Sequence, residues 1–207
     1  MVEEGKRKDP YTRVRRSRLY IPGNNPNMIQ YSGVFGADGI VLDIEDSVAP
    51  DQKDAARVLV RNALRYVDFK GSEKNVRINA LSTPYCKDDI NAIVPAGVEN
   101  IMVPKIESPE DVKEIDRLVT EAEQKAGIEP GTVKLTLMIE TPEGVAAAFE
   151  IAKASKRAVA LTIGGEDYTA AVGGQRTRAG DELLFVRSQI VNAAKAAGIQ
   201  ALDTIFA

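Results

Sequence analysis

The chain has 207 residues, of which 44% are hydrophobic and 28% are charged, and its formal net charge is −3. This composition is typical of a globular protein with a buried core, and the small negative charge excludes the basic footprint of a nucleic-acid-binding protein. No apolar stretch is long enough to span a membrane, and the charged opening lacks the apolar centre of a signal peptide. The single cysteine, Cys86, cannot form an internal disulfide. These features predict a cytoplasmic protein that binds neither nucleic acid nor membrane.

Histidine is absent from the sequence. Its absence removes the commonest general base and every histidine-based metal site. A metal centre would therefore need oxygen ligands, which favour Mg²⁺, Mn²⁺ or Ca²⁺ over Zn²⁺. Proton transfer would fall to the carboxylates.

Residues 1–15 are rich in charge, and we expect them to form a flexible arm. Residues 16–207 are predicted to form one domain, in which apolar runs of strand length alternate with apolar residues at helical spacing. The predicted strands are 18–21, 39–44, 75–79, 100–106, 134–139 and 159–163, with a seventh beginning at residue 199. The predicted helices are one from residue 26, then 53–67, 87–94, 109–126, 142–155 and 181–197.

Two of these helices have explicit start signals. Ser108 is followed by proline and then by Asp111, which predicts a capping box. Thr141 and Pro142 repeat the combination of a capping side chain and a proline at the first helical position.

The alternation of strands and helices predicts an α/β protein with a parallel sheet. An open doubly wound sheet and a closed (β/α)8 TIM barrel both fit the pattern. No G-x-G-x-x-G motif follows the first strand, which weighs against a dinucleotide-binding fold. A barrel typically has ~250 residues, so this chain would be about one strand–helix unit short.

Charged and polar residues follow the apolar runs of the predicted strands. The carboxyl ends of parallel strands carry the site in barrels and in open sheets, so we expect these side chains to surround a common mouth. Acids outnumber cations there, and a divalent cation would balance the charge and act as a Lewis acid. The residues are Asp43 and Glu45, Arg77 and Asn79, Lys105 and Glu107, Glu140, and finally Glu166 and Asp167.

Gly164 and Gly165 separate the sixth strand from Glu166 and Asp167. Without a Cβ, this backbone can approach a ligand closely. The alternative interpretation is a tight turn with two solvated acids.

Structural interpretations also exist for the charged residues. The acids after the second strand could form a solvated strand end, and Arg77 and Lys105 could be their ion-pair partners. Glu140 and Glu166 could each be structural. We favour a site because Arg77 is suited to hold a substrate carboxylate by two parallel hydrogen bonds.

Six motifs occur in order from residue 16 to the end of the chain. They resemble those of the HpcH/HpaI aldolase superfamily, which includes citrate lyase beta subunits, citryl-CoA lyases and malyl-CoA lyases, and the likeness is greatest to the citrate lyase beta subunit. The motifs are Arg16-Ser17-x-Leu19 with Pro22-Gly23, Leu42-Asp43-x-Glu45-Asp46-x-Val48 with Lys53 and Arg57, Arg77-x-Asn79, Pro104-Lys105-x-Glu107, Met138-x-Glu140-Thr141 and Gly164-Gly165-Glu166-Asp167-Tyr168.

The resemblance implies a (β/α)8 barrel that holds Mg²⁺ on Glu140 and Asp167. It implies that Arg77 binds the keto-acid part of the substrate, with Glu140 and Arg16 in the same mouth. The backbone at Gly165 and Glu166 would help to hold the chelated oxygens. It also implies a homotrimer or homohexamer, with other citrate lyase subunits as possible partners. Relatives continue beyond Asp203-Thr204-Ile205 with an eighth strand and a C-terminal segment, so the resemblance implies that this chain lacks both.

The expected reaction is the Mg²⁺-dependent cleavage of a citryl thioester to oxaloacetate and an acetyl thioester. Glu45 or Asp43 would accept the hydroxyl proton, and Lys105 would stabilise developing charge. One alternative is a malyl-CoA or related hydroxyacyl-CoA lyase or thioesterase. Another is a non-catalytic barrel subunit of a lyase complex. The sequence leaves open whether CoA or an acyl carrier protein carries the thioester.

Overall fold

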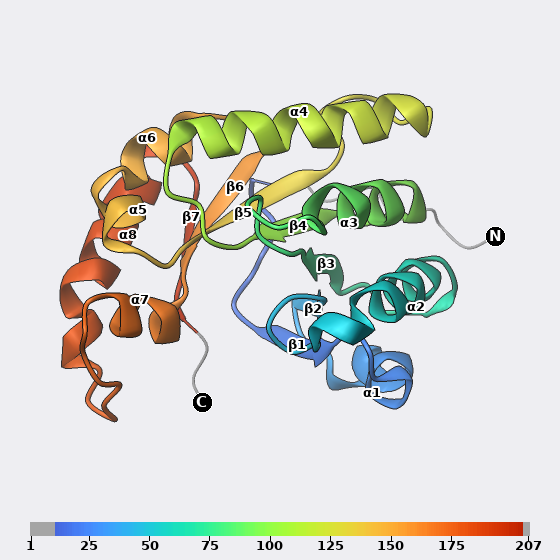
Figure 1. Ribbon diagram of the computed structural model, residues 1–207, viewed down its shortest axis with the longest axis horizontal. Coiled ribbons are helices and arrows are strands. Elements are labelled where there is room, and N and C mark those ends of the chain that lie inside the picture. The colour runs from blue at the N-terminus through green and yellow to red at the C-terminus, as the bar shows by residue number, and fades with distance from the viewer. Residues whose placement is uncertain (1–10, 205–207) are drawn as a thin grey trace.

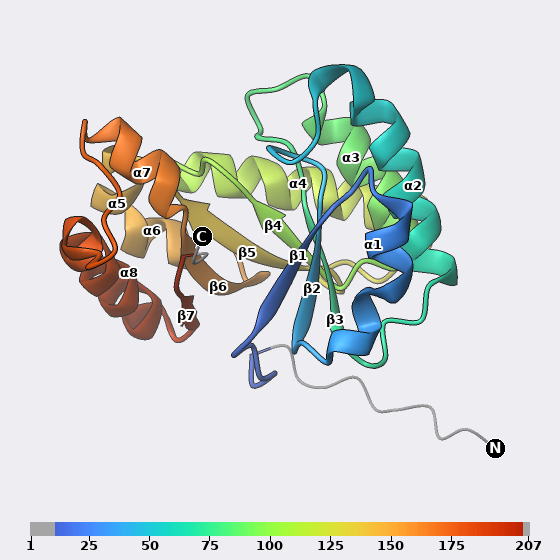
Figure 2. The same cartoon turned by 90° about the horizontal axis from the view of Figure 1, so that it is seen from below.

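The computed structural model describes residues 11–204, which form a parallel seven-stranded sheet. The spatial order of the strands is the order of the chain, and every neighbouring pair is parallel. The sheet is curled, with β1 and β7 at its two edges (Figures 1 and 2). The strands are β1 Arg18–Pro22, β2 Gly39–Asp43, β3 Glu73–Arg77, β4 Asn100–Val103, β5 Lys134–Ile139, β6 Ala158–Ile163 and β7 Gln200–Leu202.

Helices connect the strands and cover the convex face of the curled sheet (Figure 2). Four short 3₁₀ helices extend or introduce them: Ser32–Phe35, Pro50–Gln52, Val94–Ala96 and Asp181–Leu183. The α-helices are α1 Pro26–Tyr31, α2 Lys53–Tyr66, α3 Cys86–Ile93, α4 Pro109–Lys125, α5 Pro142–Ala146, α6 Ala148–Lys153, α7 Gly165–Ala171 and α8 Leu184–Ala197. None of the helices within residues 11–204 is both long and apolar enough to cross a membrane.

In the described chain β1 and β7 do not pair, so the sheet forms a partial barrel. Side chains nevertheless cross the gap between the two edges. Arg15 donates to Gln200 Oε1 at 3.0 Å, and Arg18 Nη2 donates to the carbonyl oxygen of Asp203 at 2.6 Å. Closure into a complete (β/α)8 barrel stays a prediction.

One continuous apolar core lies between the sheet and its helices. The concave side is different, because polar groups occupy part of it. Asn100 Nδ2 donates to Asn75 Oδ1 at 2.9 Å and to Thr136 Oγ1 at 2.8 Å, which joins β3, β4 and β5 across the interior. Above these amides, Val41, Met102 and Met138 form a small separate apolar cluster. The charged side chains of the mouth therefore lie on a layer of packed interior side chains.

The predicted helix starts at residues 109 and 142 are confirmed. Ser108 accepts the N–H of Asp111 while the Asp111 carboxylate accepts the N–H of Ser108, which completes the capping box. Thr141 accepts the N–H of Gly144. The second of these helices is broken at Ala147, which the sequence did not indicate.

Two predictions about local structure were wrong. The strand predicted at 100–106 ends at Val103, because Lys105 adopts a left-handed conformation with φ 53°. The alternation of strand side chains therefore does not continue to Ile106. The predicted flexible arm is too long at its end, because Arg15 is buried against Glu73; residues 1–10 of that arm lie outside the described residues.

Candidate active site

Asp43 and Arg77 form the centre of the mouth at the carboxyl ends of β2 and β3. Arg77 donates from Nε to Asp43 Oδ1 at 2.8 Å and from Nη2 to Asp43 Oδ2 at 2.7 Å. The two residues are paired in the sheet register, so their side chains leave the same face side by side. Burial raises the pKa of Asp43, but the bonds from Arg77 outweigh burial and hold that pKa below its usual value. Asp43 therefore stays ionised and fixes the guanidinium.

Glu45 lies beside this pair with spare acceptor capacity. Its Oε1 is 3.3 Å from Nζ of Lys105, and its Oε2 is 3.1 Å from Nη1 of Arg77. The second contact lacks hydrogen-bond geometry, so Oε2 is buried without a hydrogen-bond partner. Burial raises the pKa of Glu45 above its usual value, although the charges of Arg77 and Lys105 oppose the rise. Of Asp43 and Glu45, it is Glu45 that has the properties of a proton acceptor.

Lys105 joins Glu45 to Glu140. Its ammonium group contacts Glu45, while its backbone N–H donates to Glu140 Oε2 at 2.8 Å. The left-handed backbone at Lys105 is uncommon for a residue with a side chain, and such conformations gather at functional sites. Here it directs the N–H and the ammonium group of one residue at two different acids of the mouth.

Glu140 is a buried carboxylate at the end of β5, 2% exposed. Burial raises its pKa to about 8, and the nearby charges of Glu45 and Asp167 add to the rise, while the Lys105 N–H opposes it. Gly164 leaves the space that this carboxylate occupies, because a Cβ on Gly164 would lie 2.1 Å from Glu140 Oε1. The carboxylate is thus held in place but lacks a full counter-charge.

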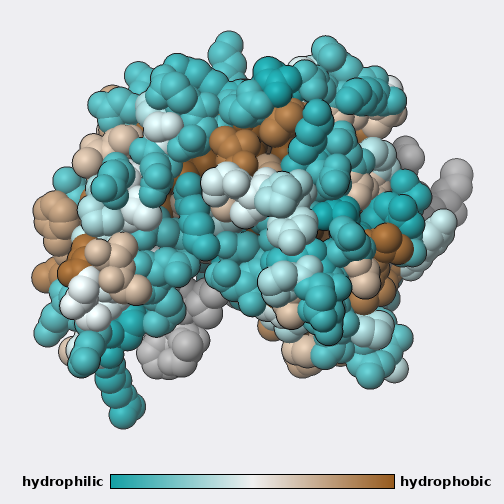
Figure 3. Space-filling model, viewed as in Figure 1, coloured by the Kyte–Doolittle hydropathy of each residue, from teal (hydrophilic) through white to brown (hydrophobic). Residues whose placement is uncertain are grey.

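Asp167 and Glu166 lie in the first turn of α7, a helix that the sequence did not predict. Asp167 is exposed and lines a cleft of about 370 Å³ together with Lys105 and Glu140. Glu166 is turned away and pairs with Arg176 at 2.8 Å. In Figure 3, hydrophilic side chains dominate the hollow on this face of the molecule.

The donor set fits a Mg²⁺ ion bound mainly by water and substrate. No group of three or more potential ligand side chains occurs among residues 11–204. Mg²⁺ usually keeps several waters and binds through one or two carboxylates, so Glu140 and Asp167 are a sufficient protein contribution. Glu140 also needs a cation, because its charge is largely uncompensated at this depth. The two residues share the cleft, and its oxygen chemistry matches this ion.

Buried polar residues behind the mouth fix the loops that carry these groups. Lys53 is buried and donates from Nζ to the backbone oxygens of Ile44 and Glu45, at 3.0 and 2.7 Å. Asp89, fully buried, accepts from Arg57 Nε at 2.7 Å and from Asn79 Nδ2 at 2.7 Å. Lys53 and Asn79 therefore hold the backbone at Ile44, beside the mouth, and Arg57 acts through Asp89.

Arg16 precedes β1 and is exposed, and it pairs with Asp38, next to the amino end of β2, at 3.0 Å. Arg77 ends β3, so the two arginines lie towards opposite ends of the sheet. Arg16 also lines a cleft with Arg18 and Tyr20, and its role in substrate binding stays a prediction. The N–H of Gly165 donates to Thr204 Oγ1 at 3.0 Å.

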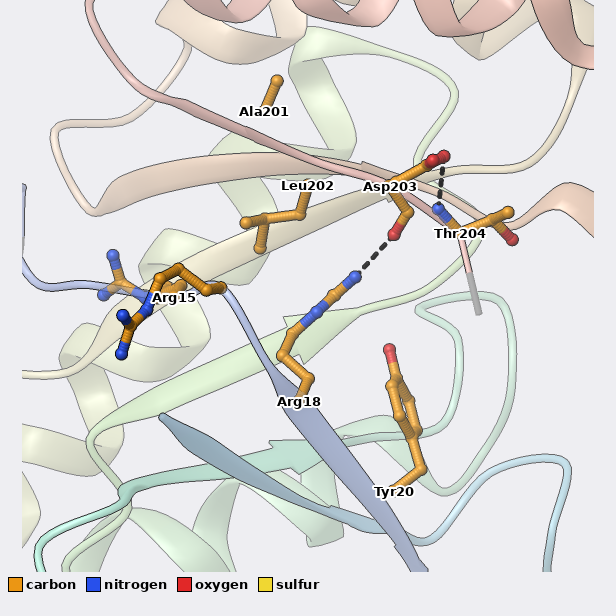
Figure 4. Close-up of a pocket in the computed structure, with 8 residues that line it drawn as sticks. Arg15, Arg18, Tyr20, Ala201, Leu202, Asp203 and Thr204 are labelled. Atoms are coloured by element: carbon orange, nitrogen blue, oxygen red, sulfur yellow. Dashed lines mark hydrogen bonds between the residues drawn. The ribbon is translucent and has the colours of Figure 1, made fainter. Parts of the chain in front are cut away.

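Arg18 and Tyr20 are two mouth residues that we missed from the sequence. Both project from β1 into the concave side beside Asp203 (Figure 4). The guanidinium carbons of Arg18 and Arg77 lie 5.9 and 5.8 Å from the centroid of the Tyr20 ring. The alternation of Arg18 and Tyr20 with Leu19 and Ile21 was the available signal, since alternate strand residues share a face.

The curled parallel sheet and its charged carboxyl edge define an α/β protein of the barrel type with an acidic, arginine-containing site. The chain belongs to the HpcH/HpaI aldolase/citrate lyase family, which matches residues 16–207. It is 46% identical over 194 residues to citrate lyase subunit beta of Leuconostoc mesenteroides subsp. cremoris, which is 94% of this chain and 64% of that relative. It is 37% identical over 174 residues to an L-malyl-CoA/beta-methylmalyl-CoA lyase of Cereibacter sphaeroides, covering 83% and 54% of the two chains.

Solved structures from Mycobacterium tuberculosis share this fold. Protein CitE in complex with magnesium and pyruvate is 32% identical with a TM-score of 0.75, covering 93% of this chain and 75% of that one. The citrate lyase beta subunit complexed with oxaloacetate and magnesium is 33% identical with a TM-score of 0.73, covering 93% and 80%. This chain spans about two thirds of the length of the citrate lyase beta subunits that it matches, and about half of the length of the malyl-CoA lyase.

Proposed function

We propose that this protein is a Mg²⁺-dependent carbon–carbon lyase that cleaves a citryl thioester to oxaloacetate and an acetyl thioester. The observation that carries the proposal is the placement of Glu140 and Asp167 on one cleft with Lys105, at the carboxyl edge of the sheet. The similarity to citrate lyase beta subunits, and to a protein complexed with oxaloacetate and magnesium, supports it.

Glu140 and Asp167 would hold the metal in this proposal. Bound Mg²⁺ supplies a Lewis acid for the substrate oxygens, which lowers the pKa of a coordinated hydroxyl group. Gly164 keeps the backbone clear of the Glu140 carboxylate, and the Lys105 N–H orients that carboxylate. The N–H of Gly165 is donated to Thr204 Oγ1, so in this proposal the backbone of Glu166 helps to position the substrate.

Glu45 is the general base of this proposal. The proton of the tertiary hydroxyl passes to its free Oε2, and the bond between the hydroxyl-bearing carbon and the methylene carbon next to the thioester breaks. The hydroxyl oxygen becomes the keto oxygen of oxaloacetate. The electron pair of the broken bond stays on the acetyl thioester, which then takes up a proton. Asp43 serves Arg77 instead, because both of its oxygens are hydrogen-bonded.

Arg77 and Lys105 supply positive charge next to the base. Arg77 uses Nε and Nη2 on Asp43. Its Nη1 lies 3.1 Å from Glu45 Oε2 without hydrogen-bond geometry, and in this proposal it donates to the substrate carboxylate. The Lys105 ammonium group is 43% exposed and stabilises the charge that develops on the acetyl product. Both cations contact Glu45.

A malyl-type thioester is the second candidate substrate, favoured by the 37% identity to a malyl-CoA lyase. A non-catalytic barrel subunit is a third possibility of another class. For either a citryl or a malyl substrate, the acyl group is carried on CoA or on an acyl carrier protein. We propose further that the protein works in the cytoplasm as a homotrimer or homohexamer, or together with other citrate lyase subunits.

The decisive experiment measures oxaloacetate release from citryl-CoA by the 207-residue chain, with and without Mg²⁺. We expect release that requires the metal and that falls at least about a hundredfold in Asp167→Ala, because one of two metal carboxylates is lost. Glu166→Ala is the matched control, since its side chain pairs with Arg176 outside the cleft. Release of glyoxylate from malyl-CoA would favour the second substrate, and an Asp167→Ala variant with full activity would refute the metal site.

A further inference from the structure

Arg18 is a cation on the concave side of the sheet that has no acidic partner among residues 11–204. Its Nη2 donates to two neutral oxygens, the Asp203 carbonyl at 2.6 Å and Thr162 Oγ1 at 3.3 Å. Its Nη1 is buried and has no hydrogen-bond partner among the described residues. An arginine that forms ion pairs with no described carboxylate and leaves a donor unused inside a protein is costly. Such a guanidinium group is suited to bind an anionic ligand.

The other cations of the mouth are already compensated. Arg77 is paired with Asp43 and lies next to Glu45, and Lys105 contacts Glu45. A substrate with one carboxylate would find its place near Arg77 and the metal carboxylates. A second carboxylate on the same substrate would need a further positive group, and Arg18 is available in the described interior.

The Tyr20 ring links Arg18 to Arg77. Both guanidinium carbons lie within 6 Å of the Tyr20 ring centroid, so the two carbons are separated by no more than about 12 Å. A four-carbon diacid with a guanidinium hydrogen-bonded to each carboxylate fits within this upper limit. Arg18 and Tyr20 line a cleft of about 480 Å³ that Arg77 does not line, and the Tyr20 ring is the wall of this cleft that lies against Arg77 (Figure 4).

We propose that Arg18 is a specificity-determining residue that binds the second free carboxylate of the substrate. This inference rests on the proposed function and sharpens it. A citryl thioester has two free carboxylates and a malyl thioester has one, so Arg18 favours the first over the second. The same logic holds for the keto acids: oxaloacetate carries two carboxylates and pyruvate carries one.

Calorimetric titration of Mg²⁺-loaded protein with oxaloacetate and with pyruvate tests the proposal without relying on turnover. In Arg18→Met, we expect oxaloacetate affinity to fall at least about tenfold, because a charge-assisted contact is lost, while pyruvate affinity changes less than about twofold. Arg18→Lys keeps the charge and should recover part of the difference. Arg117→Met, on the exposed outer side of α4, removes the same charge elsewhere and should change neither affinity.

The outcomes separate this inference from the function on which it rests. An unchanged preference for oxaloacetate in Arg18→Met, or an equal loss for both keto acids, would overturn the role of Arg18 and leave the lyase proposal standing. A wild-type chain that binds neither keto acid in the presence of Mg²⁺ would overturn both. A far-UV spectrum identical to wild type shows that Arg18→Met has folded, and Arg18→Lys provides the same comparison if it has not.

Discussion

At the scale of single residues, the position of the Glu140 carboxylate depends on the lack of a side chain at Gly164. Gly164 follows β6, next to the end of β5, and the Glu140 carboxylate fills the volume that a Cβ would need. The backbone of Gly164 has φ −93° and ψ 89°, a conformation open to other residues. The glycine is therefore required for space and not for backbone freedom.

Gly164→Ala should weaken metal binding without unfolding the protein. The new methyl group would displace the Glu140 carboxylate, so we expect Mg²⁺ affinity to fall about tenfold or more, with a native far-UV spectrum. Titration with Mg²⁺ or Mn²⁺ measures the effect. Gly174→Ala is the control, because the nearest atom to its Cβ would be the Thr169 methyl carbon at 3.2 Å, and none of the three nearest atoms belongs to a residue of the mouth. Equal metal affinity in the Gly164→Ala variant and wild type would show that Glu140 is not a ligand.

At the scale of elements, a buried ionic network ties α4 to the start of β6. Arg157 is 3% exposed and donates to both oxygens of Glu123, to Asp116 and to Thr120. Glu123 is fully buried and also accepts the backbone N–H of Val133 at 2.7 Å. Two charges at this depth stabilise the fold only as a pair, since either one alone would be buried without compensation.

Glu123→Gln should therefore destabilise the protein strongly. The amide keeps the shape of the side chain but leaves the buried Arg157 charge with only the half-buried Asp116 as its partner, so we expect the free energy of unfolding to fall by about 3 kcal/mol. Urea unfolding followed by circular dichroism measures it. Glu121→Gln, two residues earlier on α4 and paired with Arg117 at the surface, should change stability by less than about 1 kcal/mol. Similar losses in the two variants would contradict this account of the network.

The elements that the sequence predicted well are those with strong local signals. The β-branched run before Gly164 and the capping box at Ser108 placed β6 and α4 within about two residues, since patterning and capping act locally. Helix α7 was missed because two glycines open it, and glycine disfavours helices. The left-handed backbone at Lys105 and the pairing of Asp43 with Arg77 depend on neighbouring strands. Such contacts between strands cannot be predicted from one sequence.

At the scale of the whole molecule, the seven strands of the described chain and the helices between them share one core, and Cys86 belongs to it. Residues from β1 through α8 join the same apolar cluster, which runs continuously along the convex face of the sheet. A sheet built from consecutive units can lose a terminal unit before the rest unfolds. The extent of the cluster predicts that the described units unfold together, although β1 and β7 are not paired with each other.

The thiol of Cys86 reports on this cooperativity. Cys86 is 2% exposed, and burial raises its pKa to about 12, with the charges of Asp89 and Glu114 adding to the rise, so almost no reactive thiolate exists at pH 8. We expect an alkylating reagent to leave the native protein unmodified and to label Cys86 over the same range of urea concentrations in which the far-UV signal is lost. Val58→Cys, on the exposed side of α2, provides a thiol that should react at once in the native state. Labelling of Cys86 at urea concentrations well below the unfolding midpoint would show that α3 opens on its own and that the core is not one cooperative unit.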